Sequence, residues 1–204
     1  KFGNKWSHNF EIYIEYKNEE LINLNIGNYE TKSFRKIKSK DFFISDLGSD
    51  TLLVSNDSKF FIITERGLKL EFNKLGFISK ITDVNNNSNH FLYNKNNQLQ
   101  IIIDPVGREL IIEYNSQGLI SSLTGPDTKS IKYIYSSKEV LTKVEYPDGT
   151  SKNYDYNSFK QLSSIQEINT AIYRFKYSKS GKIRSIVNPL ENTCANTSFI
   201  CMYR

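Results

Sequence analysis

The chain has 204 residues, with 27 Lys and Arg against 22 Asp and Glu, a net charge of +5, and 13 Tyr and 13 Phe. This length suits one large domain or two small ones, and so high an aromatic content excludes a disordered chain. No stretch approaches the roughly 18 apolar residues that a membrane-spanning helix requires, so we expect no membrane-spanning segment.

The basic net charge does not by itself predict a nucleic-acid partner. Basic surfaces attract phosphate through counterion release, but Lys and Arg are spread along this whole chain. The densest cluster lies within residues 35–40 and is interrupted by Ile37 and Ser39. We interpret this cluster as a solvated strand or loop, and we expect no binding of nucleic acid.

Residues 1–75 contain no regular repeat and carry four carboxylates near their start, Glu11, Glu15, Glu19 and Glu20. Glycosidases use two carboxylates at a defined separation, and the sequence supplies no such separation. We interpret these four residues as the solvated face of a strand and its loop.

A period of 21 residues begins at Gly76, and position 1 of the successive units is Gly76, Asn97, Gly118, Glu139, Lys160 and Gly181. Position 3 is always a branched aliphatic residue, namely Ile78, Leu99, Ile120, Leu141, Leu162 and Ile183. Position 6 is aliphatic as well, namely Ile81, Ile102, Leu123, Val144, Ile165 and Ile186. A fixed period of this kind predicts a repeat protein whose units bury their apolar faces against one another.

The second half of each unit has the alternation of a β-strand. Position 16 is large and apolar, namely Phe91, Ile112, Tyr133, Tyr154 and Phe175. Position 18 is tyrosine in five consecutive units, namely Tyr93, Tyr114, Tyr135, Tyr156 and Tyr177. Position 17 between them varies freely, so these residues predict a strand with one buried face.

Each unit also carries two turn signals. Position 19 is Asn or Ser in five consecutive units, followed by pairs such as Gln117-Gly118, and these residues favour turns. The second signal covers positions 8 to 11, as in Asp104-Pro105-Val106-Gly107 and Tyr146-Pro147-Asp148-Gly149. Proline presets φ at the second residue of such a turn. All four prolines of the chain stand at position 9, namely Pro105, Pro126, Pro147 and Pro189.

Each unit is therefore predicted to be strand, turn, strand, turn, and the fold class to be all-β, an antiparallel ribbon of β-hairpins. Positions 3 and 6 would lie on opposite faces of an ideal strand, so we expect a β-bulge or a strong local twist between them. A coiled coil would also fit a 21-residue period. Proline at position 9 and the β-branched and aromatic strand residues reject that alternative.

These units resemble the YD repeats of Rhs proteins. Family units carry G-x-L-x-x-V-x-D-P-x-G-R and end on an aromatic-x-Tyr-Asp sequence. Residues 101–115 read I-I-I-D-P-V-G-R-E-L-I-I-E-Y-N, and residues 121–135 read S-S-L-T-G-P-D-T-K-S-I-K-Y-I-Y. Residues 2–11 are similar to the W-x-H-N-Y-E element that opens the Rhs core, and residues 67–72 are similar to the last hairpin before the repeats.

The resemblance implies a hollow β-shell that surrounds a C-terminal toxin domain. Such shells occur in secreted or surface-delivered bacterial toxins. Related repeats occur in insecticidal toxin complexes and in teneurins. Residues 1–75 would be the β-rich opening region, residues 76–187 about five and a half repeats, and residues 188–204 an atypical, truncated tail. The implied partners are the remainder of the shell and the enclosed toxin. The alternative is an adhesion or carbohydrate-binding module that uses the tyrosine column to bind cell-surface glycans.

No catalytic or cofactor site can be assembled from the sequence. His8 and His90 have no metal-ligand partners at suitable spacing, and Cys194 and Cys201 cannot form a four-ligand zinc site. Residues 83–94 match only the first half of a calcium loop, and we interpret them as a polar turn. Shells of this family end in an aspartic-protease-like region, but Asp104 lies inside a regular repeat, where D-P-x-G is turn chemistry. We therefore expect a non-catalytic protein without cofactor or metal.

Overall fold

The computed structural model describes residues 2, 6–27, 30–38, 40–46, 48–54, 59–167, 172–187 and 193–195. These residues form nineteen β-strands and no helix. The strands before the repeats are β1 (Ile12–Asn18), β2 (Leu21–Ile26), β3 (Glu30–Lys36), β4 (Phe42–Ser45), β5 (Thr51–Val54), β6 (Phe60–Ile63) and β7 (Lys69–Phe72). The later strands are β8 (Ile78–Thr82), β9 (Ser88–Tyr93), β10 (Leu99–Ile103), β11 (Glu109–Tyr114), β12 (Ile120–Thr124), β13 (Ser130–Tyr135), β14 (Leu141–Glu145), β15 (Ser151–Tyr156), β16 (Leu162–Gln166), β17 (Ile172–Tyr177), β18 (Ile183–Val187) and β19 (Thr193–Ala195).

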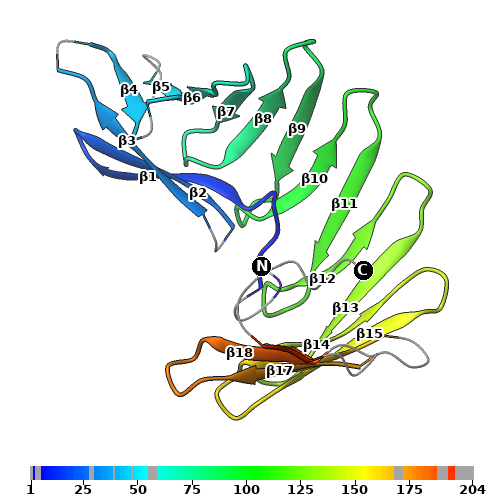
Figure 1. The fold of residues 1–204 in the computed structure, drawn as a ribbon. Helices are drawn as coiled ribbons and strands as arrows, with labels where there is room; N and C mark the ends of the chain where they lie inside the picture. The colour runs from blue at the N-terminus through cyan, green and yellow to red at the C-terminus, as the bar shows by residue number, and fades with distance from the viewer. Residues whose placement is uncertain are drawn as a thin grey trace.

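The strands form one continuous antiparallel sheet in which each strand pairs with the next along the chain. The sheet is strongly curved, and the first residues of the chain run through the hollow side of the curve (Figure 1). This all-β hairpin ribbon confirms the predicted fold class. Pro189 and most of the tail at 188–204 lie outside the described residues.

A bulge recurs in the first strand of every repeat. Tyr114 pairs with Ile120 and Glu113 pairs with Ser122, so Ser121 is an extra residue in β12. The same shift in register occurs at β8, β10, β14, β16 and β18. The bulge returns positions 3 and 6 to one face, and in β14 the residues at these positions, Leu141 and Val144, are both buried. The bulge expected from the sequence is thereby confirmed.

Both predicted turns share one geometry. In the turn at Asp104, the N–H of Gly107 donates to the Asp104 carbonyl over 3.0 Å, and the N–H of Asp104 donates to the Arg108 carbonyl. This is a type I turn closed by a residue of positive φ, a common three-residue hairpin loop. Gly107 has φ +86°, and Asn97 fills the corresponding place of the other turn with φ +57°.

The main hydrophobic cluster draws its residues from β1 to β12, and burial of the repeat positions decreases toward β18. Fifteen buried apolar residues form one cluster, and the most deeply buried side chains are Ile22, Phe34, Leu52, Ile62, Phe72, Ile78 and Ile120. Position 3 is fully buried at Ile78, but Ile183 in the last strand pair is 46% exposed. The apolar face of β16–β18 is therefore less covered by described residues than the face of the earlier repeats.

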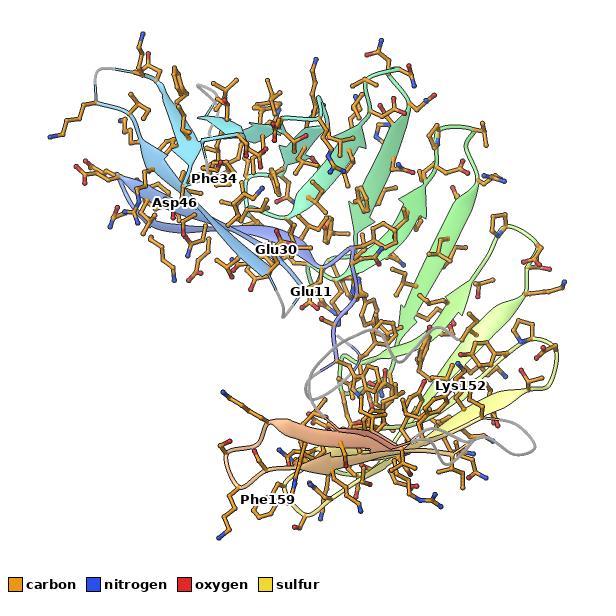
Figure 2. All side chains as sticks on the ribbon, viewed as in Figure 1. Glu11, Glu30, Phe34, Asp46, Lys152 and Phe159 are labelled. Carbon is orange, nitrogen blue, oxygen red and sulfur yellow. The ribbon has the colours of Figure 1, made fainter. Side chains whose placement is uncertain are left out.

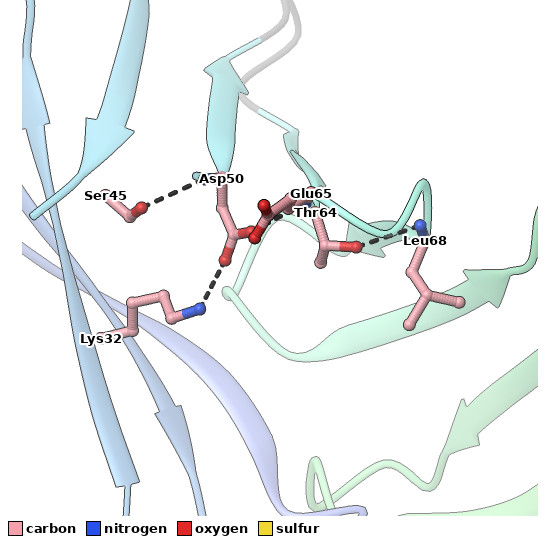
Figure 3. A network of polar contacts seen from close by, with 6 residues as sticks. All are labelled: Lys32, Ser45, Asp50, Thr64, Glu65 and Leu68. Carbon is pink, nitrogen blue, oxygen red and sulfur yellow. Dashed lines mark hydrogen bonds and ion pairs between the residues drawn. The ribbon is translucent and has the colours of Figure 1, made fainter. Parts of the chain in front are cut away.

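A buried carboxylate holds the strands before the repeats together (Figure 3). Asp50 is only 5% exposed and receives the Lys32 ammonium on one oxygen and the Glu65 N–H on the other. Its own N–H donates to the Ser45 hydroxyl over 3.1 Å. Asp50 therefore links β3, the turn after β4 and the turn after β6, and its charge is compensated as buried charges require.

The strands β1–β7 curve so strongly that β1 lies beside the start of the first repeat. Tyr13 forms an isolated antiparallel bridge with Phe77, and the Ile14 N–H donates to the Gly76 carbonyl over 2.7 Å. Because β1 is fixed there, the residues that precede it are directed along the hollow side of the repeats (Figure 1).

Candidate functional site: the tyrosine face and the segment that crosses it

The side chains at positions 16 and 18 lie on one face of the ribbon, which we call the tyrosine face. At all five position-18 tyrosines the hydroxyl donates to the main-chain carbonyl fifteen residues earlier, at position 3 of the same unit. The five donor–acceptor pairs are Tyr93 to Ile78 (2.8 Å), Tyr114 to Leu99 (2.6 Å), Tyr135 to Ile120 (2.6 Å), Tyr156 to Leu141 (2.8 Å) and Tyr177 to Leu162 (2.8 Å).

The bulge explains why a tyrosine is needed there. Strands β12 and β13 pair only from Ser122–Lys132 to Thr124–Ser130, so the backbone ladder between them has stopped before Ile120. The Tyr135 hydroxyl reaches across this gap and satisfies the Ile120 carbonyl. A buried carbonyl without a partner is costly, and the tyrosine column removes that cost in each unit.

Burial keeps these phenols protonated. It raises the pKa of Tyr114 to about 12, to which the negative charge of Glu11 also contributes, and it raises the pKa of Tyr133 to about 12. The pKa of Tyr135 is raised for the same reason. The hydroxyls therefore act as hydrogen-bond donors over the whole physiological pH range. The five tyrosines at position 18 are half-buried.

The first residues of the chain pack on this face through aromatic rings at position 16. We call Phe2 together with residues 6–11 the N-terminal segment. The Phe2 ring lies 4.7 Å from that of Tyr133, and the Phe10 ring lies 5.8 Å from that of Phe91. Packing of this kind adds to the burial of apolar area.

Trp6 makes the longest-range contact of the segment. Its ring meets Tyr154 edge-on at 5.3 Å, and its indole N–H donates to the Tyr156 hydroxyl over 2.7 Å. The N-terminal segment therefore spans four consecutive repeats, from β9 to β15, and contacts rings in the first, third and fourth of them.

Neither histidine belongs to a metal-ligand set among the residues that the structure describes. His8 packs edge-on against Phe2, and burial lowers the pKa of His8 to about 4. His90 is exposed on the other face. No group of three His, Cys, Asp or Glu side chains in the described residues is arranged to hold a metal ion.

The two acidic turns are ordinary repeat turns, as predicted. Asp83 accepts the N–H groups of Asn85 and Asn87, and the hydrogen bond from the Asn87 side chain lowers the pKa of Asp83. Asp104 likewise accepts two backbone N–H groups and pairs with Arg108 over 2.6 Å.

One carboxylate near the start of the chain differs from its prediction. Glu11 is half-buried rather than solvated, and one of its oxygens is buried without a hydrogen-bond partner. It lies on the hollow side of the sheet, between the two ends of the ribbon (Figure 2). The interpretation of Glu11 as part of a solvated face was wrong because the preceding residues turn onto the repeats.

Comparison with known families supports the repeat assignment. The teneurin YD-shell family model matches residues 26–197, which is most of the chain. The chain belongs to the teneurin YD-shell family. Its Rhs/YD-repeat character, predicted from the sequence, is thereby confirmed, and its role in this family is that of a structural shell. A search of curated proteins finds no match.

Two solved structures are similar to this chain at low sequence identity. The crystal structure of TcdB2-TccC3-TEV has 13% identity and a TM-score of 0.50, with 83% of this chain and 11% of that chain covered. The Photorhabdus luminescens Tc holotoxin pore has 12% identity and a TM-score of 0.48 over the same shares. The chain thus spans about a ninth of the length of these structures. The described part of the chain contains no helix that could cross a membrane.

Proposed function

We propose that this chain is a non-catalytic stretch of the wall of an Rhs-type toxin shell. The observation that carries the proposal is the continuous curved sheet (Figure 1). The N-terminal segment crosses it on the side of the tyrosine face, where Phe2 and Trp6 contact Tyr133 and Tyr156. A ribbon of this kind has a row of unpaired backbone groups at each open edge unless further strands cover it. The remainder of the same shell is the partner that would continue the wall.

The shell encloses a C-terminal toxin domain, and the assembly is secreted or presented at the cell surface for competition between bacteria or delivery into a host. The TcdB2-TccC3 structures support this proposal through their shared fold. The enclosing wall performs no chemistry on its cargo. Its physical task is to exclude proteases and solvent from the interior.

Protease protection tests this proposal. The protein encoded by the complete gene is digested with a broad-specificity protease, in its intact form and with Tyr135→Ala and Tyr156→Ala in the wall. We expect the C-terminal domain to resist digestion in the intact protein and to be cut at least tenfold faster in the variant. Digestion of that domain at the rate of the isolated domain would contradict enclosure.

A carbohydrate-binding module is the second candidate, and a groove over β16–β18 and the turn before β16 favours it. The groove has a volume of about 1230 Å³ and is lined by Phe159, Phe175, Tyr177 and amides such as Asn157 and Gln161. Phe159 is 78% exposed on a turn at the far end of the sheet (Figure 2). Aromatic rings beside amides are suited to stacking and hydrogen bonding with sugars. A glycan array decides this candidate: it requires specific binding that Phe159→Ala and Tyr177→Phe reduce.

A further inference from the structure

A second, smaller pocket lies where the N-terminal segment meets the first two repeats. It has a volume of about 430 Å³, within the range of about 300–1000 Å³ that is typical of ligand pockets. Its walls include the rings of Phe10, Phe77, Tyr93 and Tyr114 and the carboxylate residue Glu11. The Phe77 and Tyr93 rings stack with centroids 5.5 Å apart. The pocket is thus an aromatic enclosure with one acidic residue.

The pocket offers several hydrogen-bond acceptors, beside the His8 imidazole, the Tyr13 hydroxyl and the Asn97 amide. The hydroxyl protons of Tyr93 and Tyr114 are donated to the carbonyls of Ile78 and Leu99, so both phenol oxygens present only lone pairs. The Gln98 amide is bonded at both ends, to Asn94 and to the Gly118 carbonyl. A ligand that satisfies the phenol oxygens must therefore donate hydrogen bonds.

Among the described residues, no positive charge faces the carboxylate of this pocket. One oxygen of Glu11 is buried without a hydrogen-bond partner, the described lining contains no Lys or Arg, and the lining residue His8 is neutral near pH 7 because burial lowers its pKa to about 4. The carboxylate lies close enough to Tyr114 for its charge to contribute to the raised pKa of that phenol. Burying a carboxylate without a counter-charge is unfavourable, so a cationic ligand would remove a cost that the free protein carries.

We propose that this pocket binds an alkylammonium group. The ammonium would donate hydrogen bonds to the phenol oxygens and neutralise Glu11, while its alkyl chain packs against the rings of Phe10 and Phe77. Cations are attracted to the faces of aromatic rings. A neutral alcohol or a carboxylate ligand would gain nothing from this attraction. The ammonium could belong to a free amine or to a lysine side chain of another polypeptide. The site is formed within this chain and does not depend on the shell function.

The test uses the 204-residue chain and the probe n-butylammonium chloride, titrated at constant ionic strength and followed by calorimetry and by the NMR signals of the tyrosine rings. n-Butanol and sodium butyrate are the matched neutral and anionic probes. We expect saturable binding of n-butylammonium only, weakened at least tenfold in Glu11→Gln. Glu15→Gln, which removes an exposed carboxylate of β1, should bind as the unmodified chain does. Equal responses to all three probes, or unchanged binding by Glu11→Gln, would overturn the proposal.

The stability of Glu11→Gln gives a second test of the role of this carboxylate. Glu11→Gln should melt at the same or a higher temperature than the unmodified chain, because it removes an unpaired buried charge; a lower melting temperature together with retained binding would contradict the proposed role. If Glu11→Gln does not fold, Phe77→Leu should weaken binding several-fold through loss of one ring.

A lysine peptide shows where the ammonium comes from: an acetylated Gly-Lys-Gly amide is compared with its norleucine analogue. Tighter binding of the lysine peptide than of the free amine identifies a lysine as the ligand, and the reverse order identifies a free amine.

Discussion

In the five repeats that carry a tyrosine at position 18, the hydroxyl bonds the same partner, the carbonyl of position 3. This explains why position 18 is tyrosine rather than another aromatic residue. Tyr135 contributes a ring to the apolar face and a hydroxyl that bonds the Ile120 carbonyl over 2.6 Å. A phenylalanine would supply the ring alone. The hydroxyl bridges the gap that each bulge opens, so the side chain belongs to the backbone hydrogen-bond network.

Substitutions at Tyr135 separate these two contributions. Tyr135→Phe should lower the free energy of unfolding by about 1 kcal/mol through loss of one hydrogen bond. Tyr135→Ala should lower it by about 3 kcal/mol because the ring is also lost. Lys132→Ala, on the exposed face of the same strand, should change it by less than about 0.5 kcal/mol. Equal and small losses in urea melts of all three variants would refute the assignment of the tyrosine face.

His8 should make stability depend on pH. Its pKa is lowered from 6.5 to about 4 by burial, so below pH 6.5 the unfolded chain binds a proton that the folded chain excludes. Stability is then fully present above pH 6.5 and falls as the pH drops toward 4, by about 3 kcal/mol in total. Urea melts at pH 7 and pH 5 measure this loss.

Two variants isolate the His8 contribution. His8→Gln should reduce the difference in unfolding free energy between pH 7 and pH 5. His90→Gln, which replaces the exposed histidine on the other face, should keep the difference of the unmodified chain. An identical pH dependence in both variants would mean that His8 is not buried in solution.

At the level of the elements, each of the two turns of a repeat ends on a residue with positive φ. The space around that residue differs between the two turns. Gly107 has φ +86°, and a Cβ atom there would meet nothing within 4 Å. At Gly76, with φ +82°, a Cβ atom would lie 2.7 Å from the Ile14 carbonyl oxygen. The second glycine therefore permits both the turn and the close approach of β1.

The two glycines should respond differently to alanine. Gly107→Ala should cost about 1 kcal/mol, the strain of a left-handed backbone at a residue with a Cβ atom. Gly76→Ala should cost on the order of 3 kcal/mol, because it also pushes β1 from the first repeat. Thermal melts compare the two variants, and hydrogen exchange at the Ile14 amide should accelerate only in Gly76→Ala. Equal costs would contradict the contact between β1 and the turn at Gly76.

The strands and turns could be predicted because each depends on residues that are close in the sequence. Pro105 and Gly107 specify a turn, the spacing of positions 3 and 6 indicates a bulge, and the tyrosine period marks one face. The contact of Trp6 with Tyr156 joins residues 150 apart, and no local pattern predicts it. The burial of Glu11 was missed for the same reason, since it follows from the path of the N-terminal segment.

At the level of the whole molecule, the N-terminal segment links repeats that otherwise contact only their neighbours. In repeat proteins stability is a sum of local terms, so separate parts can open independently. Phe2, Trp6 and Phe10 connect rings from β9 to β15, and this link should make the first four repeats unfold together.

Trp6→Ala tests this link. We expect faster hydrogen exchange at the amides of β13–β16 and a loss of about 3 kcal/mol in their local stability, with no change in β3–β6. Phe159→Ala removes an aromatic ring that is 78% exposed and should leave the exchange rates as they are. Uniform acceleration over all strands in Trp6→Ala would indicate a global rather than a segmental effect.

The tyrosine face should line the interior of a closed wall, and a cryo-electron microscopy structure of the protein encoded by the complete gene tests this most directly. We predict a ribbon that continues from β19 and closes around a cavity, with Tyr93, Tyr114, Tyr135, Tyr156 and Tyr177 on the cavity side and the C-terminal domain inside. An open ribbon whose tyrosine face contacts solvent, with the C-terminal domain outside, would contradict the shell.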